Sequence, residues 1–160
     1  MKYWEYEDDK IILFWGGVLS NWYKSDFICD NTQFNCVEQY MMRKKAIVFG
    51  DYDAAKKVMS TKDPRKQKAI GRTVRNFDGD VWLEKCREEV YPGIRAKFTQ
   101  NDKLGDLLRG TGAKVIAEAS PYDKIWGIGL STNDKRAQNQ SFWQGLNILG
   151  ELLMKARKDI

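Results

Sequence analysis

The sequence predicts an α+β domain that is dominated by helices and contains one small β-sheet. Apolar residues recur with helical spacing through most of 36–109 and again in 141–157. Short β-rich runs that glycine interrupts occupy 10–27 and 114–117. The 160 residues, 42% of them hydrophobic, suffice for one hydrophobic core, so a single domain over 1–160 is expected.

The N-terminal part of this domain is expected to hold strands followed by a helix. Lys10–Phe27 consists of short β-forming runs broken by Gly16 and Asn21, which predicts two or three short strands. A helix is expected over Cys36–Phe49, and Gly50 provides a residue at which it can end.

Three further helices are predicted from their capping residues. Asp51–Met59 begins with a capping aspartate, and Asp63–Pro64 opens a helix with proline at its first position. Asp80 is expected to cap a longer helix. Pro92 should bend or interrupt that helix before the apolar pattern resumes as far as Phe98.

The C-terminal third alternates helix, strand and loop. Asp102–Arg109 has the pattern of a short amphipathic helix, Lys114–Ala117 that of a strand, and Ser120–Asp123 that of a loop. Thr132–Gln140 is polar and expected to be exposed. Ser141–Arg157 is predicted to form the last helix, because its leucines have helical spacing and basic residues follow at its end.

The composition excludes several classes of chemistry. The chain has no histidine, which excludes a Ser-His or Cys-His dyad, an imidazole general base and an ordinary zinc enzyme site. Cys29, Cys36 and Cys86 form no C-x-x-C pair and are odd in number, so buried thiols in a reducing cytoplasm are expected. We expect no metal and no cofactor.

Charge and hydropathy indicate the kind of partner. The 27 Lys and Arg exceed the 22 Asp and Glu by 5, which favours anionic partners such as phosphates or nucleic acid. A slightly basic protein without such a partner is the alternative. The polar, acidic N-terminus lacks the pattern of a signal peptide, and no apolar run reaches the roughly 20 residues of a membrane span, so no membrane partner is expected.

Glu38 and Lys45 form the first candidate for a catalytic pair. On a helix they lie seven residues apart on one face, with roughly 10 Å of axial rise between them. Met41 and Met42 lie close to the same stripe, so an acid and an amine would share apolar surroundings that shift their pKa values. The alternative is that both side chains are simply exposed.

A second candidate cluster lies after the strand at 114–117. Glu118, Ser120, Asp123 and Trp126 crowd a loop rich in proline and glycine, where binding groups are common. Paired carboxylates are the groups that glycosidic chemistry uses, one as acid and the other to stabilise charge or activate water. The alternative is a polar turn that Trp126 anchors in the core.

A third cluster is basic. Arg65 and Arg72 lie in a helix rich in lysine and arginine, and guanidinium groups bind phosphate through two hydrogen bonds at once. These residues are therefore candidates for a phosphate clamp. A solvated helix face is the alternative explanation.

Short motifs along the whole chain, in order, carry a resemblance to a known family. They are Phe14-Trp15-Gly16, Leu19-Ser20-Asn21-Trp22, Val37-Glu38-Gln39-Tyr40-Met41-Met42, Lys45-Ala46, Phe49-Gly50-Asp51, Gly71-Arg72, Lys97-Phe98, Gln100-Asn101, Thr111-Gly112, Trp126-Gly127-Ile128-Gly129 and Asn147 with Gly150. With them the chain resembles the NADAR family, also named YbiA-like. The resemblance implies a helix-rich α+β domain that hydrolyses N-glycosidic bonds of ribose compounds or binds ADP-ribose-like ligands.

The resemblance implies two possible substrates. One branch of the family breaks the N-riboside bond of phosphorylated aminouracil intermediates of riboflavin synthesis. The other removes ADP-ribose from guanine bases of DNA or RNA, and the net positive charge favours this branch. A non-catalytic module that binds ADP-ribose or NAD, and a plain nucleic-acid-binding module, are alternatives of other classes.

The resemblance also implies roles for individual residues. Glu38 would be the central acid or base, and Lys45 would act at the anomeric carbon as the nucleophile that forms a Schiff base. In a direct hydrolysis, Glu38 or Asp123 would instead activate water while Lys45 holds a phosphate or hydroxyl group. Arg72 would bind phosphate and Trp126 would stack on or enclose the base or ribose. The full set expected to bind substrate is Ser20, Asn21, Trp22, Met42, Arg72, Glu118, Ser120, Trp126 and Gly127.

Overall fold

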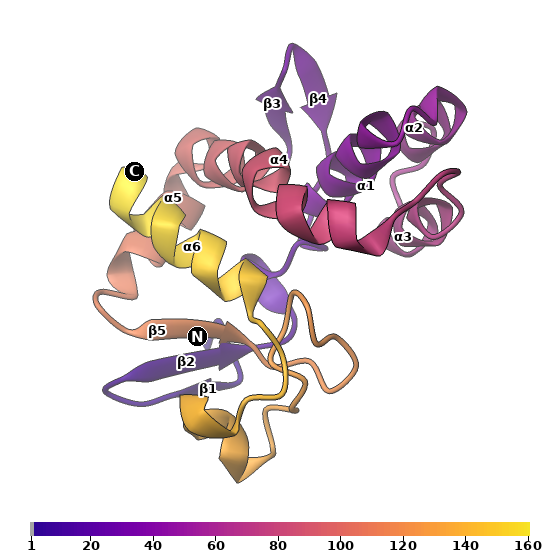
Figure 1. Cartoon of the computed structure of the whole chain (residues 1–160). Helices are drawn as coiled ribbons and strands as arrows, with labels where there is room; N and C mark the ends of the chain where they lie inside the picture. Colours follow the sequence, from indigo (N-terminus) through magenta and orange to yellow (C-terminus); the bar gives the residue numbers. More distant parts are fainter. Residues whose placement is uncertain (1) are drawn as a thin grey trace. The chain divides into compact units, whose positions relative to one another are not determined.

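The computed structural model describes residues 2–160 and confirms a helix-rich α+β fold (Figure 1). Within the described residues, the chain forms six α-helices and two small sheets. The chain divides into two compact units. The helical unit is Lys24–Asn101, and the sheet unit consists of the chain up to Tyr23 together with Asp102–Ile160.

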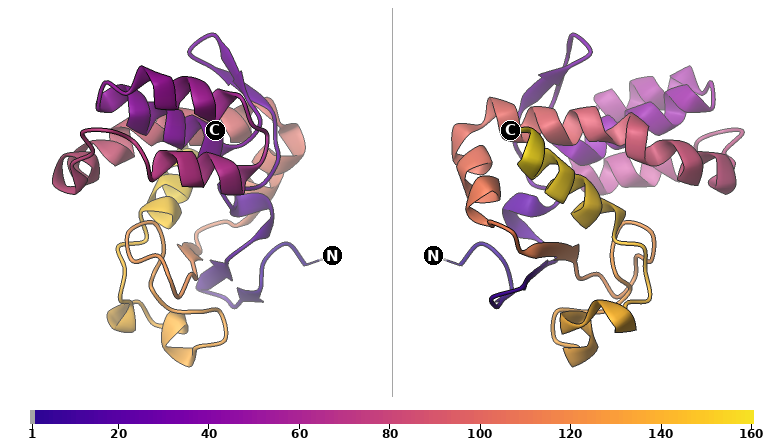
Figure 2. Two further views of the ribbon diagram at one scale, coloured as in Figure 1. Left: turned by 90° about the vertical axis from the view of Figure 1, so that its right-hand side faces the viewer. Right: turned by 60° about the vertical axis from the view of Figure 1, so that its left-hand side comes forward.

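The helical unit begins with a hairpin and continues as four helices. Strands β3 (Phe27–Cys29) and β4 (Thr32–Phe34) pair antiparallel around a two-residue turn. Both turn residues, Asp30 and Asn31, have the positive φ that tight hairpin turns require. The hairpin projects from the helices in every view (Figures 1 and 2).

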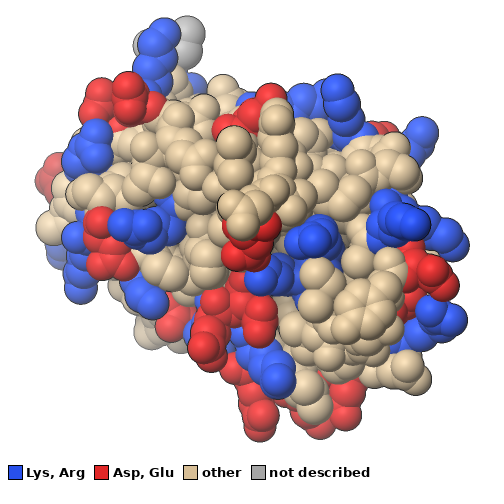
Figure 3. All heavy atoms as spheres, turned by 90° about the horizontal axis from the view of Figure 1, so that it is seen from above, with Lys and Arg blue, Asp and Glu red and all other residues tan. Residues whose placement is uncertain are grey.

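The four helices of this unit pack around the first of them. They are α1 (Val37–Val48), α2 (Tyr52–Met59), α3 (Pro64–Gly71) and α4 (Gly79–Gln100). Helix α1 contacts each of the other three. The fit is tight at Gly93 of α4, where a β-carbon would overlap the fully buried ring of Tyr40 from α1. Lys, Arg, Asp and Glu side chains cover much of the surface seen from above (Figure 3).

The sheet unit is built on three strands. They are β1 (Tyr6–Glu7), β2 (Ile11–Phe14) and β5 (Val115–Glu118). Their order is β1-β2-β5, with β1 antiparallel and β5 parallel to the central strand. Helices α5 (Asp102–Gly110) and α6 (Ile148–Asp159) complete the unit, and α6 packs against β5.

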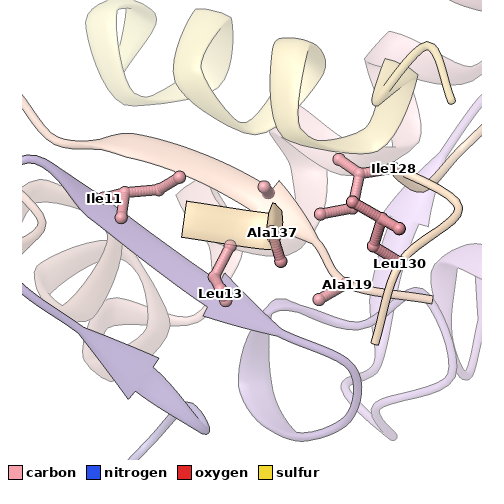
Figure 4. Packing of buried hydrophobic residues seen from close by; sticks show 7 residues of the cluster. Ile11, Leu13, Ala119, Ile128, Leu130 and Ala137 are labelled. Carbon is pink, nitrogen blue, oxygen red and sulfur yellow. The ribbon is translucent and has the colours of Figure 1, made fainter. Parts of the chain in front are cut away.

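One buried cluster holds the sheet unit together. Short 3-10 turns at Lys135–Gln138 and Gln140–Phe142 lie across the sheet from α6 (Figures 1 and 2). Ala137 of the first turn is fully buried, so the prediction that this polar segment is exposed is wrong at that position. The cluster contains Ile11, Leu13, Ala117, Ala119, Ile128, Leu130 and Ala137 (Figure 4).

The predicted starts of two helices are wrong. The last helix begins at Ile148 rather than near Ser141, because Asn147 has a left-handed backbone with φ of 56° that interrupts helical geometry. The long helix is capped by Asp78 rather than Asp80: the Asp78 carboxylate accepts hydrogen bonds from the backbone N–H of Asp80 and Val81. This helix also continues through Pro92.

Other predictions agree with the structure more closely. The helix at 36–49, the two helices capped by Asp51 and Asp63, and the strand after Lys114 are present with shifts of one or two residues. The strands, however, form two sheets rather than one. No described helix is long and apolar enough to cross a membrane.

Candidate active site

Helix α1 carries the predicted acid and amine. Glu38 lies in its first turn, where the helix dipole favours a carboxylate, and Lys45 lies in its last turn. Glu38 is only 3% exposed and Lys45 is half-buried. The alternative, that both charged groups are simply exposed, is therefore wrong. A carboxylate is costly to bury unless it is paired or hydrogen-bonded.

The surroundings of Lys45 change the acidity of its ammonium group. Burial lowers the pKa of Lys45, the nearby Glu38 carboxylate opposes this shift, and Arg72 adds to it by charge repulsion. The Lys45 Nζ lies 4.2 Å from the ring centroid of Phe77, an aromatic neighbour that was not predicted from the sequence. A lowered pKa increases the fraction of neutral amine, which is the form that attacks a carbonyl or imine carbon.

Arg72 and Met42 complete this part of the site. Arg72 follows α3 as its C-terminal cap and is exposed, and its charge acts on Lys45. Met42 is buried, and its sulfur lies so close to Gly71 that a β-carbon there would overlap it. The helical unit thus brings together a carboxylate, an amine and a guanidinium group at the meeting of α1 and α3.

The sheet unit brings together the second predicted cluster. Strands β2 and β5 are parallel, so the residues that follow them emerge at one edge of the sheet, where ligands commonly bind in α/β proteins. Glu118 ends β5. The Ser120 hydroxyl accepts hydrogen bonds from the backbone N–H of Tyr122 and Asp123, at 3.2 and 3.1 Å.

Asp123 and Trp126 stabilise the structure of the same loop. One oxygen of Asp123, Oδ1, accepts hydrogen bonds from the backbone N–H of Ile125 and Trp126, at 2.9 and 2.8 Å. Trp126 is buried, as expected for a core anchor or a wall of the site. A β-carbon on Gly127 would lie 2.9 Å from the carbonyl oxygens of Asp123 and Glu118, so the loop requires glycine at this position.

Asn21 is the predicted binding residue with the clearest unused hydrogen-bonding capacity. Its side chain is only 7% exposed, and within residues 2–160 it forms no hydrogen bond with the protein. No amide atom of Asn21 is among the fully buried polar atoms of residues 2–160 that lack a partner, so this amide keeps access to solvent and is able to hydrogen-bond a ligand. Its neighbours differ: Ser20 is buried and accepts a hydrogen bond from the Trp22 backbone N–H, and Trp22 is exposed.

Lys97 is an unusual residue for which no role in a site was predicted. It lies on α4, is 1% exposed, and burial lowers its pKa to about 7, while the nearby Cys36 opposes that shift. A signal was present in the sequence, because Lys97 follows Val90, Gly93 and Ile94 at the spacing of one buried helix face.

The described residues were searched for groups of side chains that could bind a metal ion. In the part of the chain from residue 2 onward, no three His, Cys, Asp or Glu side chains are grouped as metal ligands. The three cysteines are free thiols: Cys36 is buried as predicted, Cys86 is also buried, and the prediction that Cys29 is buried is wrong, because Cys29 is half-buried.

The buried carboxylate of Glu38, the partly desolvated amine of Lys45 and the guanidinium of Arg72 are groups of the kind that acid–base and amine chemistry uses. The chain belongs to the NADAR domain family, which it matches over residues 13–160. This confirms the family that the motifs indicated.

Individual relatives agree with this assignment. N-glycosidase R617 of Acanthamoeba polyphaga mimivirus is 39% identical, over 96% of this chain and 98% of the relative. The riboflavin biosynthesis protein PYRR of Arabidopsis thaliana is 30% identical over 68% of this chain, which spans only 17% of that protein. The NMR structure of the E. coli protein YbiA shares the fold, with a TM-score of 0.77 at 24% identity, over 96% of this chain and 86% of YbiA.

Proposed function

We propose that this N-glycosidase removes ADP-ribose from guanine bases of nucleic acid. The general class, cleavage of N-glycosidic bonds, is that of the mimivirus relative, which aligns with this chain over nearly its whole length. The observation that carries the finer proposal is the half-buried Lys45 amine, whose pKa is lowered, beside the buried Glu38 and the charge of Arg72.

The distribution of charge supports a polyanionic substrate. The helical unit holds 16 Lys and Arg against 11 Asp and Glu, which leaves +5, whereas the sheet unit holds 11 of each. Within the helical unit, the basic segment 51–75 holds 8 Lys and Arg against 3 Asp and Glu. Such a concentration of charge fits a phosphate backbone better than a single small riboside.

Several cations of the basic segment are available to a ligand. Arg75 is engaged by the Asp51 and Asp53 carboxylates. Within the described chain, the exposed cations of this segment that form no ion pair include Lys56, Lys57, Lys62, Arg65 and Lys66. In Figure 3 basic side chains lie on both sides of the face shown, and several of them lie on its right-hand side, the side on which Figure 1 labels α2 and α3.

In the first proposed route, Lys45 is the nucleophile. Its neutral amine adds to C1 of the opened ribose, the C1–N bond to guanine breaks, and guanine leaves with a proton that Glu38 relays. The resulting C1=N bond to Lys45 is hydrolysed by water, which releases ADP-ribose and restores the amine. One water is consumed overall.

In the second route, water attacks C1 directly. A carboxylate, Glu38 or Asp123, takes a proton from water as the bond to guanine breaks, and Lys45 or Arg72 holds a phosphate or hydroxyl group. Asn21, whose amide forms no hydrogen bond with the described residues, is expected to hydrogen-bond the ligand in both routes.

A comparison of two substrates tests the proposal. The protein is incubated with single-stranded DNA that carries ADP-ribosyl-guanine and, separately, with a phosphorylated aminouracil riboside, and products are identified by mass spectrometry. We expect ADP-ribose and unmodified guanine from the DNA. Cleavage of the riboside alone would replace the proposal with the second candidate, which the similarity to PYRR favours. Binding of ADP-ribose without any cleavage would indicate a non-catalytic reader.

Variants connect the activity to the site. Glu38→Gln and Lys45→Ala should each reduce turnover by at least about 100-fold, the usual range for loss of an acid–base group or nucleophile. Lys44→Ala is the matched control, because Lys44 neighbours Lys45 but pairs with Asp30 at 2.9 Å. Borohydride should trap ADP-ribose on Lys45 only in the first route. Full turnover by both site variants would exclude this site.

A further inference from the structure

Two exposed aromatic side chains meet where strands β2 and β5 end. Trp15 follows β2 directly and is 51% exposed, and Tyr122 lies four residues beyond the end of β5 and is 84% exposed. Their ring centroids are 6.1 Å apart with planes inclined at 48°. The parallel pairing that opposes Phe14 to Glu118 brings the two rings to the same edge of the sheet.

The backbone under both rings is fixed by side-chain hydrogen bonds. The N–H of Trp15 donates to Glu5 Oε2 at 3.1 Å, and the N–H of Tyr122 donates to Ser120 Oγ at 3.2 Å. The pairing of the two strands extends one step further, through a 2.7 Å hydrogen bond from the N–H of Ala119 to the carbonyl oxygen of Phe14. A fixed backbone beneath two large aromatic rings leaves only side-chain freedom to lose when a ligand binds.

Two exposed aromatic rings that lie against each other leave apolar area that a ligand can cover. Large aromatic rings dominate binding energetics when they become covered, and a Tyr that is 84% exposed contributes little to its own fold. The pair adjoins Ser120 and Asp123, two residues predicted to belong to the site. The sheet unit that carries it has no net charge, so a flat neutral group is the ligand that its chemistry fits, and not a phosphate.

We propose that Trp15 and Tyr122 form a stacking platform for an unpaired base of the nucleic-acid strand. The inference rests on the proposed nucleic-acid substrate and adds to it a residue pair that holds an unmodified base of the same strand. Every base presents a flat π-face, so the platform binds bases with little sequence preference. In this proposal the basic segment 51–75 binds phosphates, and the platform binds bases.

Binding to unmodified strands tests the platform without relying on catalysis. Fluorescence anisotropy measures the affinity of the full chain for a labelled single-stranded DNA and for a strand of equal length without bases. The variant Trp15→Ala/Tyr122→Ala should bind the normal strand about 5- to 100-fold more weakly than the wild type, the range for loss of stacking on one base. The wild type should bind the strand without bases about as weakly as the variant binds the normal strand.

The dependence on salt separates stacking from charge. The double variant should keep the wild-type slope of log affinity against log salt, because every phosphate-binding cation is still present. Phe142→Ala is the matched control: Phe142 is 55% exposed in the same unit, and its replacement should not affect binding. Trp15→Phe/Tyr122→Trp should restore most of the affinity, because both positions retain aromatic faces.

Three results would overturn the platform. The first is a double variant that binds the normal strand as tightly as the wild type does. The second is a double variant that loses affinity equally for the strand without bases. The third is a double variant that loses affinity equally for free ADP-ribose, because the adenine of ADP-ribose would then be the group that stacks on the rings. The proposed function fails independently, if the wild type releases no ADP-ribose from modified DNA, and the strand-binding result then still decides on the platform.

Discussion

Burial of Lys97 should make the protein more stable as the pH rises from 7 to 9. Its pKa is lowered from 10.5 to about 7 in the folded protein. Between these values the unfolded chain keeps the proton on Lys97 and the folded chain releases it, so the unfolded state binds more protons. The free energy of unfolding then increases with pH.

The size of the effect follows from the shift. One pKa unit corresponds to about 1.4 kcal/mol, so the change of 10.5 to about 7 limits the whole effect to about 5 kcal/mol. Integration between pH 7 and pH 9 gives about 2 kcal/mol. Burial raises the pKa of the Cys36 thiol from 9.0 to about 11, which acts in the opposite sense, and removes roughly 0.4 kcal/mol up to pH 9. The chain has no histidine to titrate in this window.

Urea unfolding followed by circular dichroism at pH 7, 8 and 9 measures the effect. The wild type should gain stability across the series, and Lys97→Met should lose most of this gain. Lys85→Met is the control, because Lys85 is exposed on the same helix and should behave as the wild type. Equal pH dependence in the wild type and Lys97→Met would refute the reasoning.

Three other changes have definite expected results. Gly93→Ala should lower the free energy of unfolding by about 1–3 kcal/mol, since the methyl group overlaps the buried ring of Tyr40; Gly79→Ala, with its nearest neighbour at 3.9 Å, should not, and equal urea midpoints for the two would contradict this. Asn147→Ala should cost about 2–4 kcal/mol by thermal unfolding, because it removes two hydrogen bonds to the backbone of β5 and leaves a non-glycine residue at φ of 56°. Replacing Lys56, Lys57, Lys62, Arg65 and Lys66 by glutamine should reduce the salt slope of single-strand binding by about 0.7 for each phosphate that the variant no longer binds. An unchanged slope, as expected when five exposed lysines and arginines of the sheet unit are replaced instead, would exclude this segment from the interface.

The parts of the fold that follow from local chemistry were predicted from the sequence. The Asp51 carboxylate accepts a hydrogen bond from the N–H of Ala54, and Asp63 precedes a proline at the first helical position, so two helix starts depend on neighbouring residues alone. The late start of α6 could not be predicted in this way. It depends on Asn147, whose side chain bonds to Glu118 and Ile116 about thirty residues away.

In the sheet and in the candidate site, too, features set by neighbouring residues could be predicted and features set by distant residues could not. The pairing of β2 with β5 joins segments about a hundred residues apart, so no local pattern specifies its register. Glu38 and Lys45 could be predicted as one pair because helical period is local. Helical spacing places Lys97 on the apolar face of its helix, but the burial of its ammonium group could not be predicted, because a lysine on such a face ordinarily exposes its charged end and only the packed neighbours decide otherwise.

The absence of histidine limits how this protein can move protons near neutral pH. The shifted carboxylate of Asp51 has a pKa of about 2, far from neutrality, whereas burial moves the pKa values of Lys45 and Lys97 down toward it. A mechanism in which Lys45 attacks C1 therefore requires a rate that rises with pH as the amine loses its proton. A mechanism in which a carboxylate activates water does not need a neutral amine, so its rate does not follow the deprotonation of Lys45. The pH profile of turnover thus separates the two routes, because the group that must be deprotonated is an amine in one and a carboxylic acid in the other.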